Sequence, residues 1–316
     1  MPPAKPVPAP FSFRALLGGA LWVACYAWFR PEWAVAIVWL GALVMTPLAL
    51  GLVERGRTPF RLIGRAQLPA ALLLVAAFVT DHYGFALSLP WIALTAACGA
   101  TGVWRLAKLG VRRAGAIADV GMFWFAVSGM WAAAYFLGLE VFKLPPLIAL
   151  LTVVHQTYAG LVLHVVASRI VAWRGNRFAV AAAAGVVAGN PLVATGIAIS
   201  YGGLGVWFEV AAAVFLSCAA IMLGWVQLFY ALWPGSGLPR TSRVLLLLSD
   251  LSFGTALTLA IIFAYGTWRG WPTLTIPEMI TWHGTLQAFG FSLCALVGWT
   301  LAAGKQRSSS VSQWLP

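Results

Sequence analysis

Charged side chains are scarce in this sequence. Asp, Glu, Lys and Arg make up only 9% of its 316 residues, whereas they make up roughly 25% of a typical soluble domain. Acidic residues are the rarest of them, with 8 Asp and Glu against 20 Lys and Arg. Hydrophobic residues make up 61% of the chain, and the mean hydropathy is +0.89. This composition excludes a water-soluble enzyme.

The motifs of several common enzyme classes are also missing. The four cysteines form no CxxC pair, and we expect them to pack among apolar side chains. The sequence contains no Walker loop, no HExxH and no GxSxG. These absences argue against ATP-driven transport and zinc-dependent proteolysis.

Apolar runs of about 20 residues recur along nearly the whole chain. Each is long enough to cross a hydrocarbon core of roughly 30 Å as a helix, and none shows the alternation that is typical of barrel strands. The sequence therefore predicts an all-α polytopic transmembrane helix bundle. We place ten spans near residues 13–29, 33–53, 66–81, 88–104, 118–139, 145–169, 178–200, 206–233, 244–266 and 279–302.

The distribution of basic residues predicts the orientation of the bundle. With ten spans, 17 of the 20 Lys and Arg residues fall on one side, and only Arg30, Lys143 and Arg269 fall on the other. The positive-inside rule then places both termini in the cytoplasm. We expect the net charge of +12 to lie against the anionic head groups of membrane lipids, and we expect no nucleic acid as a partner.

A single transmembrane domain is expected over residues 13–303. Residues 1–12 are Pro-rich and are predicted to form a disordered lead. Residues 304–316 are predicted to form a polar cytoplasmic tail, as is common at chain ends. No convincing internal repeat is found, so the sequence does not demand an inverted-repeat transporter.

Ionisable residues are the most informative ones, because a polar side chain in hydrocarbon is costly without a partner or a function. Acidic residues at span ends, such as Glu54 and Asp119 on the inner side, are expected to be solvated. His155 differs from them, because it lies about 15 Å into its span at 1.5 Å per residue. Tyr158 follows on the same face at i+3. The two side chains are expected either to line a cavity or to bond to a neighbouring helix.

The last span carries a second histidine. His283 lies in its second turn, and Gln287 follows at i+4 on the same face. They could supply a proton-transfer group and an orienting amide to a pocket, or form a hydrogen bond between helices. Glu209, one turn into another span from the same outer side, is expected at the same depth and is the best candidate for a catalytic carboxylate. We expect His155 and His283 to face one shared cavity.

Two further features lie elsewhere in the spans. Asp250 lies roughly two turns from the cytoplasmic side, where it either holds helices together or relays a proton. Asn190 precedes Pro191 in the middle of a span, and the proline removes a backbone hydrogen bond. A kink is expected there, and Asn190 is a candidate for substrate binding.

Three segments resemble the YndJ-like family of bacterial membrane proteins. Residues 283–291 (HGTLQAFGF) are similar to that family's HGxxNAxGF hallmark, with Gln287 in place of Asn. Residues 155–160 (HQTYAG) resemble its HFHYAG segment, although the second histidine is replaced by Thr157, which weakens any metal site. Asn190-Pro191-Leu192 matches as well. The resemblance implies a multi-pass protein of the bacterial inner membrane, and it supports the choice of His155 and His283.

Two functions remain open. The first is an intramembrane enzyme in which His155, His283 and Glu209 perform acid and base chemistry on a lipophilic small molecule that is bound by Tyr158, Asn190 and Gln287. Isomerisation, cyclisation or elimination would suit this chemistry and needs no cofactor and no metal. Haem ligation by the two histidines is a weaker alternative.

The second function is a proton-coupled transporter or permease. In this case the same residues carry the coupling proton, and Asp250 extends the relay to the inner side. The gathering of the histidine and glutamate candidates in the outer half of the membrane favours the enzyme, because an enzyme needs its groups at one depth.

Overall fold

The structure is a computed structural model that describes residues 10–53, 58–80, 82–271 and 273–312. In these residues the chain forms helices joined by short connections, and no strand is present. Nine helices of this described part are long and apolar enough to cross a membrane. They confirm the predicted all-α polytopic bundle and correspond to nine of the ten predicted spans. The remaining predicted span, 13–29, coincides with the shorter apolar helix Phe13–Phe29.

The helices follow one another with short connections. The N-terminal part forms α1 (Pro10–Phe29), a span built from α2 (Trp33–Leu40), η1 (Gly41–Met45) and α3 (Thr46–Val53), and the helices α4 (Thr58–Val79), α5 (Gly84–Leu109) and α6 (Ala114–Phe136). The middle part forms the turn η2 (Val141–Lys143) and a span built from α7 (Pro146–His155), η3 (Gln156–Val162) and α8 (Leu163–Arg174). The C-terminal part forms α9 (Arg177–Tyr201), α10 (Trp207–Leu232), the turn η4 (Pro234–Ser236), α11 (Arg240–Arg269), and a last span built from α12 (Ile276–Glu278), η5 (Met279–Gly284), η6 (Leu286–Leu293) and α13 (Cys294–Ser312).

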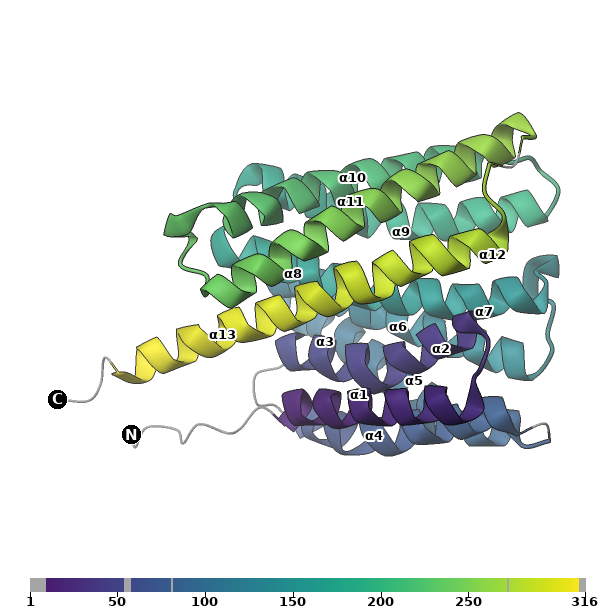
Figure 1. Ribbon diagram of the computed structural model, residues 1–316, viewed down its shortest axis with the longest axis horizontal. Coiled ribbons are helices and arrows are strands. Elements are labelled where there is room, and N and C mark those ends of the chain that lie inside the picture. Colours follow the sequence, from purple (N-terminus) through teal and green to yellow (C-terminus); the bar gives the residue numbers. More distant parts are fainter. Residues whose placement is uncertain (1–9, 54–57, 81, 272, 313–316) are drawn as a thin grey trace.

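The last span lies between two groups of helices (Figure 1). Helices α1 to α5 lie on one side of it and α9 to α11 on the other, and α13 crosses the view diagonally. Packing contacts agree with this view, because α13 contacts both α3 and α11, and α8 contacts both α6 and α9. Large apolar side chains such as Trp39, Phe125 and Trp299 are fully buried where these spans meet.

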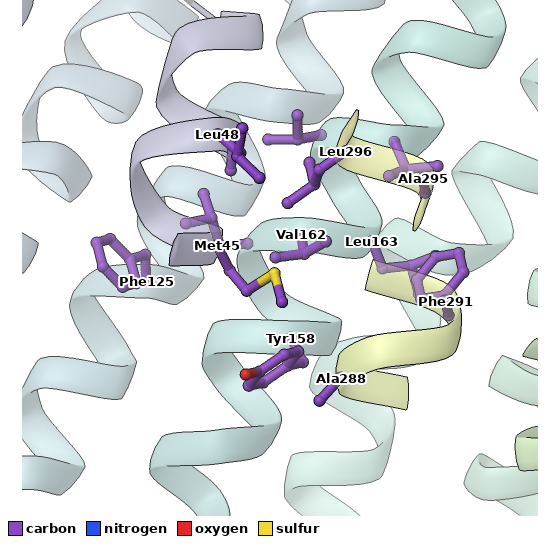
Figure 2. Packing of buried hydrophobic residues seen from close by; sticks show 14 of the residues in the cluster. Met45, Leu48, Phe125, Tyr158, Val162, Leu163, Ala288, Phe291, Ala295 and Leu296 are labelled. Atoms are coloured by element: carbon purple, nitrogen blue, oxygen red, sulfur yellow. The ribbon is translucent and has the colours of Figure 1, made fainter. Parts of the chain in front are cut away.

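Three spans depart from α-helical geometry where they meet. The segments η1, η3 and η6 are π-helical, as is η5 directly before η6. Such wide turns are rare and are frequent at functional sites. The segments η1, η3 and η6 contact one another, and their residues Met45, Tyr158 and Phe291 lie together in the packed interior (Figure 2). Widened helical turns therefore form the centre of the bundle.

Helix α9 continues through Pro191 as one α-helix from Arg177 to Tyr201. The helix therefore continues past the proline at which the sequence predicts a kink. Close packing against α10 explains why, because a Cβ added at Gly189 would lie 2.9 Å from a side-chain carbon of Leu216 on α10. Neighbouring helices commonly hold a proline-containing span in this way.

The ends of the helices gather into two opposite faces. One face joins the end of α3, the start of α4, the end of α5, the start of α6 and the end of α8. The other face joins η2, the end of α9, the start of α10 and the end of α11. Helix α1 begins, and α13 ends, at the same end of the bundle (Figure 1). Helix α13 extends to Ser312, inside the predicted tail, and α1 begins at Pro10, inside the predicted lead, whose residues 1–9 lie outside the described residues.

Candidate functional site

A large cavity lies at the end of the bundle opposite to the start of α1. Its volume is about 990 Å³, at the upper end of the range of roughly 300–1,000 Å³ that is typical of small-molecule sites. The walls come from α6, η2, α7, η3, α9, α10, α11 and α12, and most of the side chains on them are apolar. No Lys or Arg is among the lining residues that the structure describes. The polar members of the lining include His155, Gln156, Thr195, Glu209 and Thr267.

His155 reaches the cavity from the last position of α7, directly before η3. Pro146 occupies the first turn of α7, where proline suits a helix start. The Nε2 atom of His155 is buried and has no hydrogen-bond partner among the described residues. A buried polar atom without a partner is costly, so a bound molecule with a hydrogen-bonding group would stabilise this arrangement.

His283 approaches the same region from η5 in the last span. Its Nδ1 lies 2.8 Å from the backbone carbonyl of Ala256 on α11. Because a carbonyl only accepts hydrogen bonds, Nδ1 carries the hydrogen, and in the neutral ring Nε2 carries the lone pair. The rings of His155 and His283 lie close enough to repel each other when both are protonated. His283 does not belong to the lining, so only His155 of this pair faces the cavity.

Glu209 lies in the first turn of α10 and lines the same cavity as His155. Close packing of α9 against α10 holds it there, because a Cβ added at Gly196 would lie 2.7 Å from the Cα of Glu209. Tyr201, at the end of α9, lines the same wall and is within electrostatic reach of Glu209. Within the described part of the chain, no three His, Cys, Asp or Glu residues are grouped as a metal site would require. The site therefore offers one carboxylate and one imidazole to a bound molecule.

The three candidate binding residues are held differently. Asn190 donates from Nδ2 to Oε1 of Gln156 over 3.0 Å, and its Oδ1 is buried without a partner among the described residues. Tyr158 donates its hydroxyl to the carbonyl of Ile37 over 2.9 Å, which joins η3 to α2. Gln287 is half-buried in η6. None of Asn190, Tyr158 and Gln287 lines the cavity, whereas Gln156 does, and Gln156 thereby connects the cavity to Asn190.

Asp250 lies outside the cavity in a separate polar network. Gln227 on α10 donates to Oδ1 of Asp250 over 2.9 Å and accepts a hydrogen bond from the indole of Trp299 over 2.8 Å. Ser249 donates to the carbonyl of Phe291 in η6 over 3.2 Å. Oδ2 of Asp250 is buried and has no partner among the described residues. The network ties α10 and α11 to the last span.

The rim of the cavity contains strained backbone. Phe142 and Lys143 in η2 have φ angles of 56° and 58°, in the left-handed region that costs L-residues roughly 1–2 kcal/mol each. Phe142 also lines the cavity, and its side chain is largely exposed. Backbone strain of this kind clusters at functional sites. The strained backbone therefore indicates a functional site at this end of the bundle, independently of the histidines.

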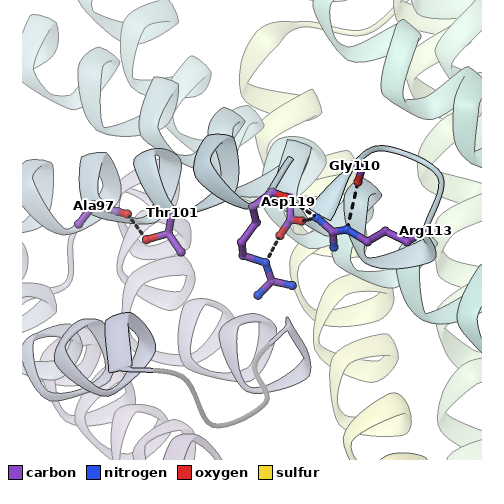
Figure 3. Close-up of polar contacts among 6 residues, drawn as sticks. Ala97, Thr101, Gly110, Arg113 and Asp119 are labelled. Atoms are coloured by element: carbon purple, nitrogen blue, oxygen red, sulfur yellow. Dashed lines mark hydrogen bonds and ion pairs between the residues drawn. The ribbon is translucent and has the colours of Figure 1, made fainter. Parts of the chain in front are cut away.

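Asp119 corrects one expectation from the sequence. Its position near the start of a span predicts a solvated carboxylate, but its side chain is fully buried. Nε of Arg105 lies 2.8 Å from Oδ1 of Asp119, and Arg113 pairs with Oδ2 while also donating to the carbonyl of Gly110 (Figure 3). The expectation is wrong because both arginines fold over the carboxylate and replace water. The closeness of Arg113 to Asp119 in the sequence was the signal for this ion pair.

Most of the chain is similar to one family of membrane proteins. A family model described as YndJ-like protein matches residues 36–291, a range that includes His155, Glu209 and His283. The membrane protein YndJ of Bacillus subtilis is 31% identical to the chain over 241 residues. The aligned part covers 75% of this chain and 42% of that relative, so the chain spans less than half the length of the curated relative it matches. No solved structure shows a significant match.

Proposed function

The chain belongs to the YndJ-like family of membrane proteins, and we propose that it is an enzyme of the bacterial inner membrane that acts on a lipophilic small molecule by acid and base chemistry. The reaction class is isomerisation, cyclisation or elimination. The observation that carries the proposal is that His155 and Glu209 line one cavity of about 990 Å³. The chemistry requires no cofactor, and the termini lie in the cytoplasm.

The lining of the cavity supports an uncharged lipophilic substrate. Its walls are mainly apolar, and the described lining contains no Lys or Arg that would hold a phosphate or carboxylate. A few hydroxyl and amide groups, including those of Thr195, Thr267 and Gln156, are available to orient the molecule. Such a division between apolar walls and a few polar groups is typical of small-molecule sites.

The two histidines provide a route for a proton. Repulsion between the rings of His155 and His283 disfavours a proton on both rings at once, so the pair is suited to accepting one proton at a time. The Nδ1 hydrogen bond of His283 to Ala256 leaves its Nε2 to take up that proton. The histidine pair then removes a proton from the substrate, and a second group returns a proton to a different atom of the substrate. Glu209, which lines the same cavity, is suited to that second role.

Filling the cavity tests whether it holds the substrate. In Ala198→Trp, a lining residue of α9 becomes an indole, and we expect loss of any lipophilic molecule that remains bound to the purified protein. Mass spectrometry of the intact protein in detergent, followed by chromatography of the released molecules, measures this occupancy. Ala100→Trp, at an exposed position of α5, is the matched control and should keep the molecule. Equal occupancy in both variants would contradict the proposal.

A proton-coupled transporter is the second candidate because of Asp250. Its Oδ2 is buried without a partner in the described residues. Asp250 bonds to Gln227 in the second half of α10, whereas Glu209 lies in the first turn of the same helix. Buried acids within spans are frequent in proton relays. A relay needs carboxylates at several depths, whereas the enzyme needs its groups at one depth.

Asp250→Asn separates the two candidates. The enzyme is expected to keep at least half of its turnover in this variant, because Asn preserves the hydrogen bond with Gln227 and Asp250 does not line the cavity. A carrier would instead lose uptake driven by a pH gradient, because the relay loses a proton-binding group. Product formation and pH-driven uptake, measured in the same liposomes, decide between them. Loss of turnover in the folded variant would favour the transporter.

A further inference from the structure

One side of α9 leads from the lipid to the His155 cavity. Five exposed residues follow one another on this side at intervals of three or four, namely Ala181, Ala184, Ala188, Leu192 and Thr195. Residues at this spacing lie on one side of a helix, and because α9 is long and apolar enough to cross a membrane, this side faces lipid. Of the five, Thr195 lines the cavity. The cavity therefore reaches the lipid-facing side of α9 at Thr195.

The lipid-facing side of α6 reaches the same cavity. Phe123, Met130 and Leu137 are exposed there and lie seven residues apart, which is close to two helical turns. Of the three, Met130 lines the cavity, and it is 59% exposed. Trp131 and Ala134 line the cavity as well, but they are buried. Because α6 and α9 contact each other, Met130 and Thr195 border the place where the cavity meets the lipid.

The depth of Met130 and Thr195 places this side opening in the hydrocarbon region. Met130 lies six residues before the end of α6, and Thr195 lies six residues before the end of α9. Both are therefore about 9 Å from the helix ends at 1.5 Å per residue. Helices of 23 and 25 residues exceed a hydrocarbon core of roughly 30 Å by only a few residues. A molecule that is dissolved in the bilayer can thus reach the cavity without passing through water.

Thr195 provides the side opening with a free hydroxyl. Thr255 and Thr258 are also exposed within a span, and each donates its hydroxyl to the backbone carbonyl four residues earlier. The hydroxyl of Thr195 makes no hydrogen bond with any of the described residues. A polar group without a partner is costly in hydrocarbon. A ligand that accepts a hydrogen bond would therefore be stabilised at Thr195.

The lining of the cavity determines which lipid fits. Among its described residues there is no Lys or Arg, and Glu209 contributes a carboxylate, so a negatively charged head group would be repelled. Ala194 and Ala198 of α9 leave an apolar passage behind the side opening. We propose that the cavity admits its ligand sideways from the bilayer, between Met130 and Thr195, and that this ligand is a lipid with a long apolar chain and an uncharged hydroxyl or carbonyl head group. The proposal rests on the enzyme function proposed above and specifies its substrate class.

Entry is measured with photoreactive probes on the full chain in liposomes. A hexadecanol that carries a diazirine on its chain is mixed into the liposomes, which are irradiated after increasing times, and labelling of the peptide that contains His155 is quantified by mass spectrometry. A diazirine-bearing butanol is added from the water as the comparison, because the cavity also extends to the exposed Phe142 and Leu204 outside the spans. We expect Thr195→Trp to slow labelling by the hexadecanol about tenfold, and we expect labelling by the butanol to stay unchanged.

Two further variants and one further probe complete the test. Ala188→Trp is the matched control, because Ala188 belongs to the exposed side of α9 but does not line the cavity, and it should be labelled as the parent is. Met130→Trp narrows the side opening from α6 and should act as Thr195→Trp does, so it carries the test if Thr195→Trp does not fold. Hexadecyl phosphate with the same diazirine should label about tenfold less than the hexadecanol does.

Three outcomes would overturn the proposal. Equal labelling rates in the parent, Thr195→Trp and Met130→Trp would show that the lipid does not enter between α6 and α9. An equal loss of labelling by the hexadecanol and the butanol would show that the indole fills the cavity instead of closing its side. Labelling by hexadecyl phosphate as strong as by the hexadecanol would show that an uncharged head group is not selected. Entry of the hexadecanol as expected, in a chain that shows no turnover, would remove the enzyme proposal and leave the side opening supported.

Discussion

Replacing His155 by alanine is expected to lower turnover by about 10²–10⁴-fold, the usual contribution of a general acid or base. His155 is the histidine of the pair that faces the cavity, and its Nε2 has no partner among the described residues. The fold should survive, because the side chain makes no described hydrogen bond that joins helices. Turnover is measured as product formed by the purified chain in liposomes prepared with bacterial lipid extract, and folding is measured by helix content and thermal unfolding.

A second histidine gives the matched control for this prediction. His82 is exposed in the connection between α4 and α5, and His82→Ala should keep the turnover of the parent. His283→Ala should resemble His155→Ala, because the proposed proton route runs through both rings. Turnover of His155→Ala within threefold of the parent would remove the basis of the enzyme proposal.

Replacing Asp119 by alanine is expected to destabilise the fold by about 3–5 kcal/mol, as is typical when one partner of a buried ion pair is removed. The substitution leaves Arg105 and Arg113 without their shared carboxylate at a largely buried position. It also releases the contact that holds the α5–α6 connection against α6. The free energy of unfolding is measured by titrating the protein in mixed micelles with a denaturing detergent.

An exposed acid provides the comparison for Asp119. Glu140 lies before η2 and is exposed, so Glu140→Ala should leave the free energy of unfolding nearly unchanged. If Asp119→Ala unfolds at the same detergent concentration as Glu140→Ala, the ion pair contributes little, and apolar packing alone holds α5 against α6.

The fold was accessible from the sequence because its strongest signal is local. A run such as 206–233 needs only its own length and apolar composition to predict a span, and it corresponds to α10. The π-helical segments were not accessible in this way. Nothing in residues 156–162 distinguishes η3 from an α-helix, because the wide turn arises where three spans pack together.

The site was only partly accessible for the same reason. Depth within a span could be counted, and it placed Glu209 level with His283 and His155 farther into the membrane. The structure brings His155 and Glu209 to one cavity. The direction in which a side chain points could not be derived from the sequence. It depends on how the helix is rotated about its axis and on where its turns widen. His283 therefore lies beside the cavity, although it was expected to face it. The partners of Tyr158 and Asp250 depend on long-range packing that no local pattern contains.

The wide turns at the centre of the bundle have an evolutionary consequence. Each residue of an α-helix advances the chain by about 100° around the axis, so the loss of one residue in a buried span turns everything beyond it to another face. A π-helical turn holds one residue more than an α-helical turn. If a residue is lost within Gln156–Val162 or Leu286–Leu293, the turn narrows and the flanking helices keep their faces. Descendants of this chain can therefore lose a residue in these segments, whereas the same loss elsewhere in a packed span would disrupt the bundle.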